Sequence, residues 1–181
     1  DRNFKNLIKG FFYDGYTMHQ LACNSPHFVF WLGKKNQSLK KKFWENLNDF
    51  VKKKFDLNEK NMISKYTNLI HNIFKQEKFE KLNMFDNSLY VVEPNKKLKN
   101  IEKTIDENGT FFEKNIKDIF ELKKYITKKC QTITYYGLEK NKIRNFLISS
   151  NLRGVDRIVP IGSALEMDIT WDGYNLINSL T

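Results

Sequence analysis

Cys23 is the side chain in this sequence whose type and setting best suit covalent chemistry. It stands in the segment Q-L-A-C-N-S-P-H at residues 20–27, between a predicted helix and a predicted strand. A thiolate in such a turn can attack a carbonyl carbon, because small and polar neighbours leave room for a substrate and backbone N–H groups can hold the oxyanion. His19 and His27 are near enough in sequence to support a thiolate. The local pattern taken alone favours the other interpretation, a small inert Cys23 that fills space, as free cysteines often do.

The remaining candidates for chemistry carry weaker signals. Cys130 opens a predicted strand after two lysines, which favours a structural thiol. Glu93 follows a predicted strand, so its carboxylate could reach the crevice at the carboxyl end of a sheet. Glu113 follows a short apolar pair. Each carboxylate is either a second acid of a site or a solvated loop charge, and the sequence favours the loop charge.

The motifs of several other enzyme classes are missing from the sequence. Neither the G-x-G-x-x-G nor the G-x-x-x-x-G-K-[ST] phosphate loop occurs, and there is no G-x-S-x-G elbow. The three histidines and two cysteines lack the spacing of zinc ligands. An independent nucleotide-dependent enzyme or a metal site is therefore not expected from these residues.

Composition limits the partners and the compartment. The chain has 181 residues and a formal net charge of +10, but only four of its 31 basic residues are arginine. Arginine makes the bidentate contacts to phosphates and bases, so this charge does not predict a nucleic-acid partner. No apolar run approaches the roughly 20 residues needed to cross a bilayer. Two cysteines fit a reducing cytoplasm better than a disulfide scaffold.

Alternating helical and strand-like segments are the elements that must position Cys23. Apolar residues recur at helical spacing at 1–18, 38–55, 58–74, 116–128 and 139–150, with a short last helix expected at 174–180. Apolar and β-branched runs predict strands at 28–32, 89–92, 131–136 and 155–161, and the polar stretch 95–109 is the expected loop. Strands separated by helices imply crossover connections. The sequence therefore predicts one α/β domain, with a mostly parallel sheet of about four or five strands and helices on both faces.

Three segments, in chain order, resemble those of a known family. They are residues 1–31, especially the cysteine segment at 20–27, then C-Q-T-I-T-Y-Y-G at 130–137, and G-V-D-R-I-V-P-I-G-S-A-L at 154–165, which continues to W-D-G-Y-N-L-I at 171–177. The A-C-N-S-P string resembles the active-cysteine loop of the LuxC family, the long-chain acyl-CoA reductases of the aldehyde dehydrogenase superfamily. The last segment resembles the C-terminal signature of the same family. One departure is Leu21, which stands two residues before the cysteine where typical members of the superfamily have Gln.

The resemblance implies an aldehyde-dehydrogenase-like catalytic domain over residues 1–181, preceded in a longer protein by a nucleotide-binding domain. A start at Asp1 rather than Met agrees with that expectation. Cys23 is then the expected nucleophile. The resemblance also yields the weaker expectations, which are substrate contacts from Asn24, Ser25 and His27 and a cofactor contact from Glu113.

The activity implied by the resemblance is reduction of an acyl-CoA or acyl-carrier thioester to a fatty aldehyde, in a cytoplasmic protein that is a homo-oligomer at full length. NADPH, bound mainly by the upstream domain, is the expected cofactor, and no metal is expected. Asp156 and Arg157, within the signature, are expected to hold the sheet edge or a domain contact rather than to act in catalysis. Two alternatives stay open. One is a related semialdehyde or acyl-phosphate reductase, and the other is a basic binding or assembly module with an inert cysteine.

Overall fold

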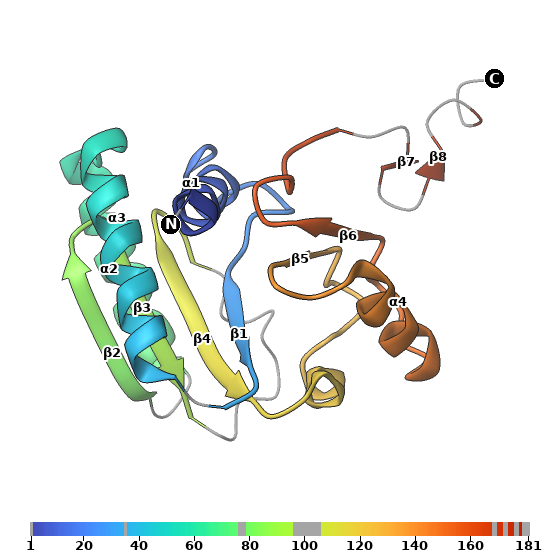
Figure 1. The fold of residues 1–181 in the computed structure, drawn as a ribbon. Coiled ribbons are helices and arrows are strands. Elements are labelled where there is room, and N and C mark those ends of the chain that lie inside the picture. Colours follow the sequence, from blue (N-terminus) through green and yellow to red (C-terminus); the bar gives the residue numbers. More distant parts are fainter. Residues whose placement is uncertain are drawn as a thin grey trace.

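A four-stranded sheet flanked by α-helices forms the larger part of the structure (Figure 1). The structure is a computed structural model that describes residues 2–34, 36–75, 79–95, 106–167, 170–171, 174–175 and 178. The elements run in the order α1 (Arg2–Tyr16), β1 (Phe28–Leu32), α2 (Gln37–Lys54), α3 (Glu59–Lys75), β2 (Phe79–Asp86), β3 (Leu89–Pro94), β4 (Thr110–Ile116), the 3₁₀ helix η2 (Ile119–Lys124), β5 (Thr132–Tyr135), α4 (Lys140–Ser149), β6 (Arg157–Pro160), β7 (Thr170–Trp171) and β8 (Tyr174–Asn175).

The strand order in the main sheet is β1-β4-β3-β2. β1 pairs with β4 and β4 with β3 in parallel, whereas β2 pairs with β3 antiparallel as a hairpin. The helices α2 and α3 lie between β1 and β2 in the chain. The predicted fold class, a mostly parallel sheet with helices, is confirmed.

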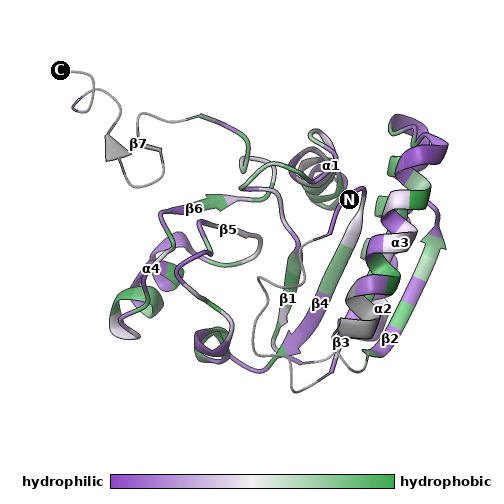
Figure 2. Cartoon of the chain, turned by 180° about the vertical axis from the view of Figure 1, so that it is seen from behind, coloured by the Kyte–Doolittle hydropathy of each residue, from purple (hydrophilic) through white to green (hydrophobic). Residues whose placement is uncertain are grey.

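Alternate residues of β3 and β4 point to opposite faces of the sheet and form two cores. Leu89, Val91 and Phe111 pack with α1 and α2. Tyr90, Val92 and Phe112 pack with Leu69 of α3 on the other face. The edge strand β2 mixes hydrophobic and hydrophilic residues (Figure 2) and has two register shifts in its pairing with β3. Helices therefore cover both faces of the sheet, as the sequence predicts.

A second, smaller unit follows the main sheet. β5 and β6 pair in parallel, and α4 and η2 pack beside them around Ile119, Ile143, Phe146 and Leu147. The segment after β6, residues 161–166, then returns to α1 (Figure 1). This return brings the C-terminal signature back to the beginning of the chain.

The central strand β4 is the main element that the sequence pattern fails to predict. Its sequence T-F-F-E-K-N-I has polar residues in its second half. Glu113 is nevertheless buried there, where polar groups from distant parts of the chain contact its carboxylate. The helix predicted at 116–128 is also wrong. Ile116 ends β4, and within the predicted helix residues 119–124 form a 3₁₀ helix. The side chain of Asp118 caps it by accepting from the N–H of Phe120 at 2.8 Å.

Other boundaries differ in smaller ways. β2 was absent from the expected strands, and residues 174–175 form β8 where a helix was expected. The other residues of that predicted helix, except 178, lie outside the described residues, as do residues 96–105 of the predicted loop. Asn58 caps α3, accepting a hydrogen bond from the N–H of Asn61 at 2.9 Å.

Among the helices of the described residues, none combines the length and the apolar character that a membrane crossing requires.

Candidate functional site

Cys23 is exposed on the loop that joins α1 to β1. The N–H of Ser25 donates to the carbonyl of Ala22 at 2.9 Å, so Cys23 and Asn24 are the two central residues of a tight turn. Among the described residues, the backbone N–H groups of Cys23 and Asn24 have no hydrogen-bond acceptor. The turn therefore presents a thiol together with two free backbone donors, the combination that acyl transfer through a cysteine needs.

Gln20 fixes this loop to the beginning of β4. Its side-chain amide is fully buried and donates to the carbonyls of Pro26 (2.8 Å) and Thr110 (2.9 Å). Its oxygen accepts from the N–H groups of Gly109 (3.0 Å) and Thr110 (3.1 Å). Both polar ends are thus satisfied at a residue whose own φ is +65°, a left-handed conformation that tertiary contacts must hold. Gln20 acts in positioning the cysteine loop.

The two histidines of the segment lie in different settings. His19 pairs with Asn108 twice, through its Nδ1 (3.0 Å to Oδ1) and through its carbonyl, which accepts from the Asn108 N–H at 3.0 Å. His27 is mostly buried, and burial lowers its pKa from 6.5 to about 4, against a smaller rise from a hydrogen bond with the Asp106 backbone. His27 is therefore neutral at physiological pH. Its Nδ1 has no hydrogen-bond partner.

A network of buried polar groups joins the cysteine loop to the C-terminal signature. The Asn24 amide donates to the carbonyl of Ala164, and Arg157 Nη1 donates to the same oxygen at 2.8 Å. Asp14 of α1 accepts from the N–H groups of Gly162 (2.7 Å) and Ala164 (3.0 Å). Burial raises the pKa of Asp14, and these two backbone hydrogen bonds partly offset that rise. Segments about 140 residues apart, those carrying the resemblance, thus meet at Ala164.

Two further observations agree with a structural role for the signature. Gly10 of α1 lies so close to Gly162 that a Cβ at position 10 would meet the Gly162 Cα at 3.0 Å. Arg157 also donates to the carbonyls of Ser163 (3.4 Å) and Glu166 (2.7 Å). The Arg157 side chain therefore holds the 163–166 backbone in place.

The expected substrate contacts take different positions around Cys23. Asn24 is nearly buried and its amide is used at Ala164. Ser25 is buried, and its hydroxyl oxygen has no hydrogen-bond partner. Cys130 is half-buried, and its sulfur lies 3.4 Å from the Thr127 nitrogen in a local turn, which agrees with a structural thiol. Of the two cysteines, only Cys23 is exposed.

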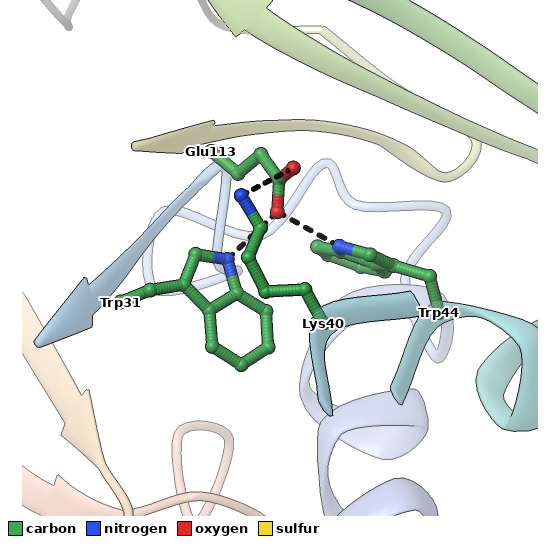
Figure 3. Close-up of polar contacts among 4 residues, drawn as sticks. All are labelled: Trp31, Lys40, Trp44 and Glu113. Carbon is green, nitrogen blue, oxygen red and sulfur yellow. Dashed lines mark hydrogen bonds and ion pairs between the residues drawn. The ribbon is translucent and has the colours of Figure 1, made fainter. Parts of the chain in front are cut away.

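Glu113 belongs to a separate buried cluster on the α2 face of the sheet (Figure 3). Its Oε2 accepts from the indole N–H groups of Trp31 (2.7 Å) and Trp44 (2.9 Å). Its Oε1 lies 2.9 Å from the ammonium of Lys40, and both side chains are about 5% exposed. Both oxygens are therefore engaged by groups of this chain.

Beside this cluster lies a pocket of about 740 Å³. Its lining comes from α2 and from β2, β3 and β4, and includes Lys40, Trp44 and Glu113. No residue of the cysteine loop lines it. The structure therefore does not bring Glu113 and Cys23 into one pocket.

Asp14, Gln20 and Lys40 organise these sites, although the sequence pattern does not single them out. The available signal for Asp14 was its position in the apolar stripe of α1, because a charged residue on an inward face requires partners. Lys40 carried no signal, since its partners Glu113 and Trp31 come from β4 and β1. Comparison with protein-family models finds no match to this chain, and comparison with curated proteins finds none either.

Proposed function

We propose that this chain carries the nucleophile of an acyl-thioester reductase, with Cys23 as the residue that accepts the acyl group from acyl-CoA or an acyl carrier. The observation that carries the proposal is the contact between two of the three segments that resemble the LuxC family. The cysteine loop and the signature meet through Asn24 and Ala164, so the likeness describes one local structure rather than two unrelated strings.

The setting of Cys23 supports acyl transfer. The thiol is exposed at a turn, and its loop is fixed by the four hydrogen bonds of Gln20 and by the contact of Asn24. A fixed nucleophile needs little reorganisation to reach an acyl carbonyl, which lowers the entropic part of the barrier. Exposed Met18 and Leu21 on the same loop offer apolar surface to an acyl chain.

In the acylation step, the Cys23 thiolate attacks the thioester carbon and a new C–S bond forms. The negative charge passes to the carbonyl oxygen, where the free N–H groups of Cys23 and Asn24 can donate to it. Collapse of this tetrahedral species breaks the original C–S bond and expels the carrier thiolate. The acyl group then remains on Cys23 as a thioester.

Release of an aldehyde requires a hydride donor, which the resemblance implies is NADPH bound mainly by another domain. Glu113 does not fit the cofactor contact expected of it, because Trp31, Trp44 and Lys40 engage both of its oxygens. We therefore derive only the acylation half of the reaction from this chain.

Intact-mass analysis of the chain after incubation with a long-chain acyl-CoA tests the proposal. We expect one acyl adduct, removed by hydroxylamine, in the native chain and in Cys130→Ser, and none in Cys23→Ser. An adduct that persists in Cys23→Ser contradicts the assignment of the nucleophile. If the longest available form of the protein shows no adduct either, the reductase proposal is wrong and a binding or assembly role takes its place.

A further inference from the structure

The pocket beside Glu113 contains a buried cation whose hydrogen-bonding capacity is incompletely used. Lys40 is 4% exposed, and its ammonium carries three N–H donors. Its ammonium forms an ion pair with Glu113 at 2.9 Å and lies 6.0 Å from the centre of the Trp31 ring, and its Nζ makes no hydrogen bond of good geometry. The acceptor capacity of Glu113, in contrast, is well used, because its carboxylate also accepts from two indole N–H groups. The cluster is therefore rich in donors and short of acceptors.

A buried ion pair is costly, and replacing it by apolar residues is often neutral or stabilising. The Lys40–Glu113 pair is therefore poorly explained by stability alone. Glu113 holds the ammonium in a fixed place, and two tryptophans hold Glu113 (Figure 3). Fixing a cation in this way at the wall of a pocket prepares it to meet an anion.

The rest of the lining favours a phosphorylated ligand. Lys41 and Lys81 also line the pocket; Lys41 forms an exposed ion pair with Glu45 at 3.6 Å, and Lys81 stands opposite Glu93 across the β2–β3 hairpin. A phosphate offers three acceptor oxygens to such a set of lysines, whereas a carboxylate offers two. Trp44 and Phe85, whose side chains lie on the α2 face of the sheet, line the pocket as well, so an organic group attached to the phosphate would meet apolar surface. The volume of about 740 Å³ lies in the usual range for small-ligand sites.

We propose that the pocket between α2 and the β2–β3–β4 face binds a small organic phosphate, whose phosphate contacts Lys40 and Lys81. This site is separate from Cys23, and it does not depend on the function proposed for that cysteine. Glu113 then serves to position Lys40 rather than to contact the ligand.

Tryptophan fluorescence tests the proposal, because the indoles of Trp31 and Trp44 both bond to the carboxylate that holds Lys40. The native chain is titrated with ADP, with inorganic pyrophosphate and with acetate at constant ionic strength. We expect saturable changes with ADP and pyrophosphate and none with acetate. Tighter binding of ADP than of pyrophosphate would indicate that the organic group contacts the apolar wall of the pocket.

Two substitutions and a matched control decide the site. Lys40→Met should abolish saturation, and Lys81→Met, at an exposed residue, should weaken binding about tenfold or more, the usual effect of losing a charged hydrogen bond. Lys53→Met, on an exposed turn of α2 outside the pocket, should leave binding unchanged.

If Lys40→Met does not fold, as far-UV circular dichroism would show, the comparison of Lys81→Met with Lys53→Met still tests the site. The proposal is overturned if the native chain shows no saturable change, if acetate binds as well as ADP, or if Lys81→Met and Lys53→Met behave alike. Cys23→Ser should bind ADP and pyrophosphate as the native chain does. A failure of the acylation experiment would therefore not count against this site.

Discussion

Lys65 should make the folded protein more stable as the pH rises from 7 to 9. The side chain is fully buried on α3, where its ammonium donates to the carbonyl of Asn87 at 2.9 Å and lies 4.0 Å from the centre of the Tyr90 ring. Burial lowers its pKa from 10.5 to about 7, although the charges of Asp106 and Asp86 raise it.

The sign of the effect follows from proton binding. Between pH 7 and 10.5 the unfolded chain keeps a proton on Lys65 that the folded chain has lost, so stability increases with pH in that window. The shift corresponds to a penalty of about 5 kcal/mol, fully present below pH 7. From pH 7 to 9 the free energy of unfolding should rise by about 2 kcal/mol from this group alone.

Urea unfolding of the native chain and of Lys65→Met, at pH 7, 8 and 9, isolates the effect. Subtracting the two series removes the contributions of other titrating groups, because methionine fills a similar volume without a charge. Lys65→Met should lose about 2 kcal/mol of the pH-dependent gain. Parallel pH profiles for the two proteins would refute the argument that Lys65 is buried and neutral at pH 9.

Three other changes have defined outcomes. Gln20→Ala removes four buried hydrogen bonds and should lower the free energy of unfolding by roughly 2–5 kcal/mol in urea denaturation; a loss under about 1 kcal/mol would mean that the amide does not fix the loop. Gly10→Ala should destabilise by about 1–3 kcal/mol because its Cβ meets Gly162, whereas a helix position without that contact would gain stability, so a raised melting temperature would contradict the close packing. Iodoacetamide should modify exposed Cys23 well before half-buried Cys130, as peptide mapping over time would detect; equal rates would count against the exposed turn.

The parts of the fold that depend on local pattern could be predicted from the sequence. The helices α1, α2 and α4 follow apolar periodicity, the strand β1 follows a continuous apolar run, and the loop around Cys23 lies between these two patterns. The mostly parallel sheet follows from the order of these elements.

The parts that depend on distant partners could not be predicted. Glu113 is buried because residues of β1 and α2 supply three donors to it, and no local signal in β4 announces them. On α3, apolar periodicity predicts Ile63 and Tyr66 inside, yet both are more than half exposed and Lys65 is buried instead. Carbonyls of Asn87 and Gly109 hold the Lys65 ammonium, and both come from later segments of the chain.

The same contrast applies to the candidate site. The thiol of Cys23 could be singled out from its neighbours in sequence, whereas the groups that fix its loop could not. Asp14 and Ala164 are 150 residues apart, and only the folded chain joins them at the signature.

The most direct test of the account is whether a thioester transfers its acyl group to Cys23. The protein is incubated with a long-chain acyl-CoA, digested without reducing agent, and its peptides are mapped by mass spectrometry. The account predicts an acyl group on the peptide that contains Cys23, lost on treatment with hydroxylamine, and none on the peptide that contains Cys130. Acylation of both cysteines alike, or of Cys130 alone, would contradict it.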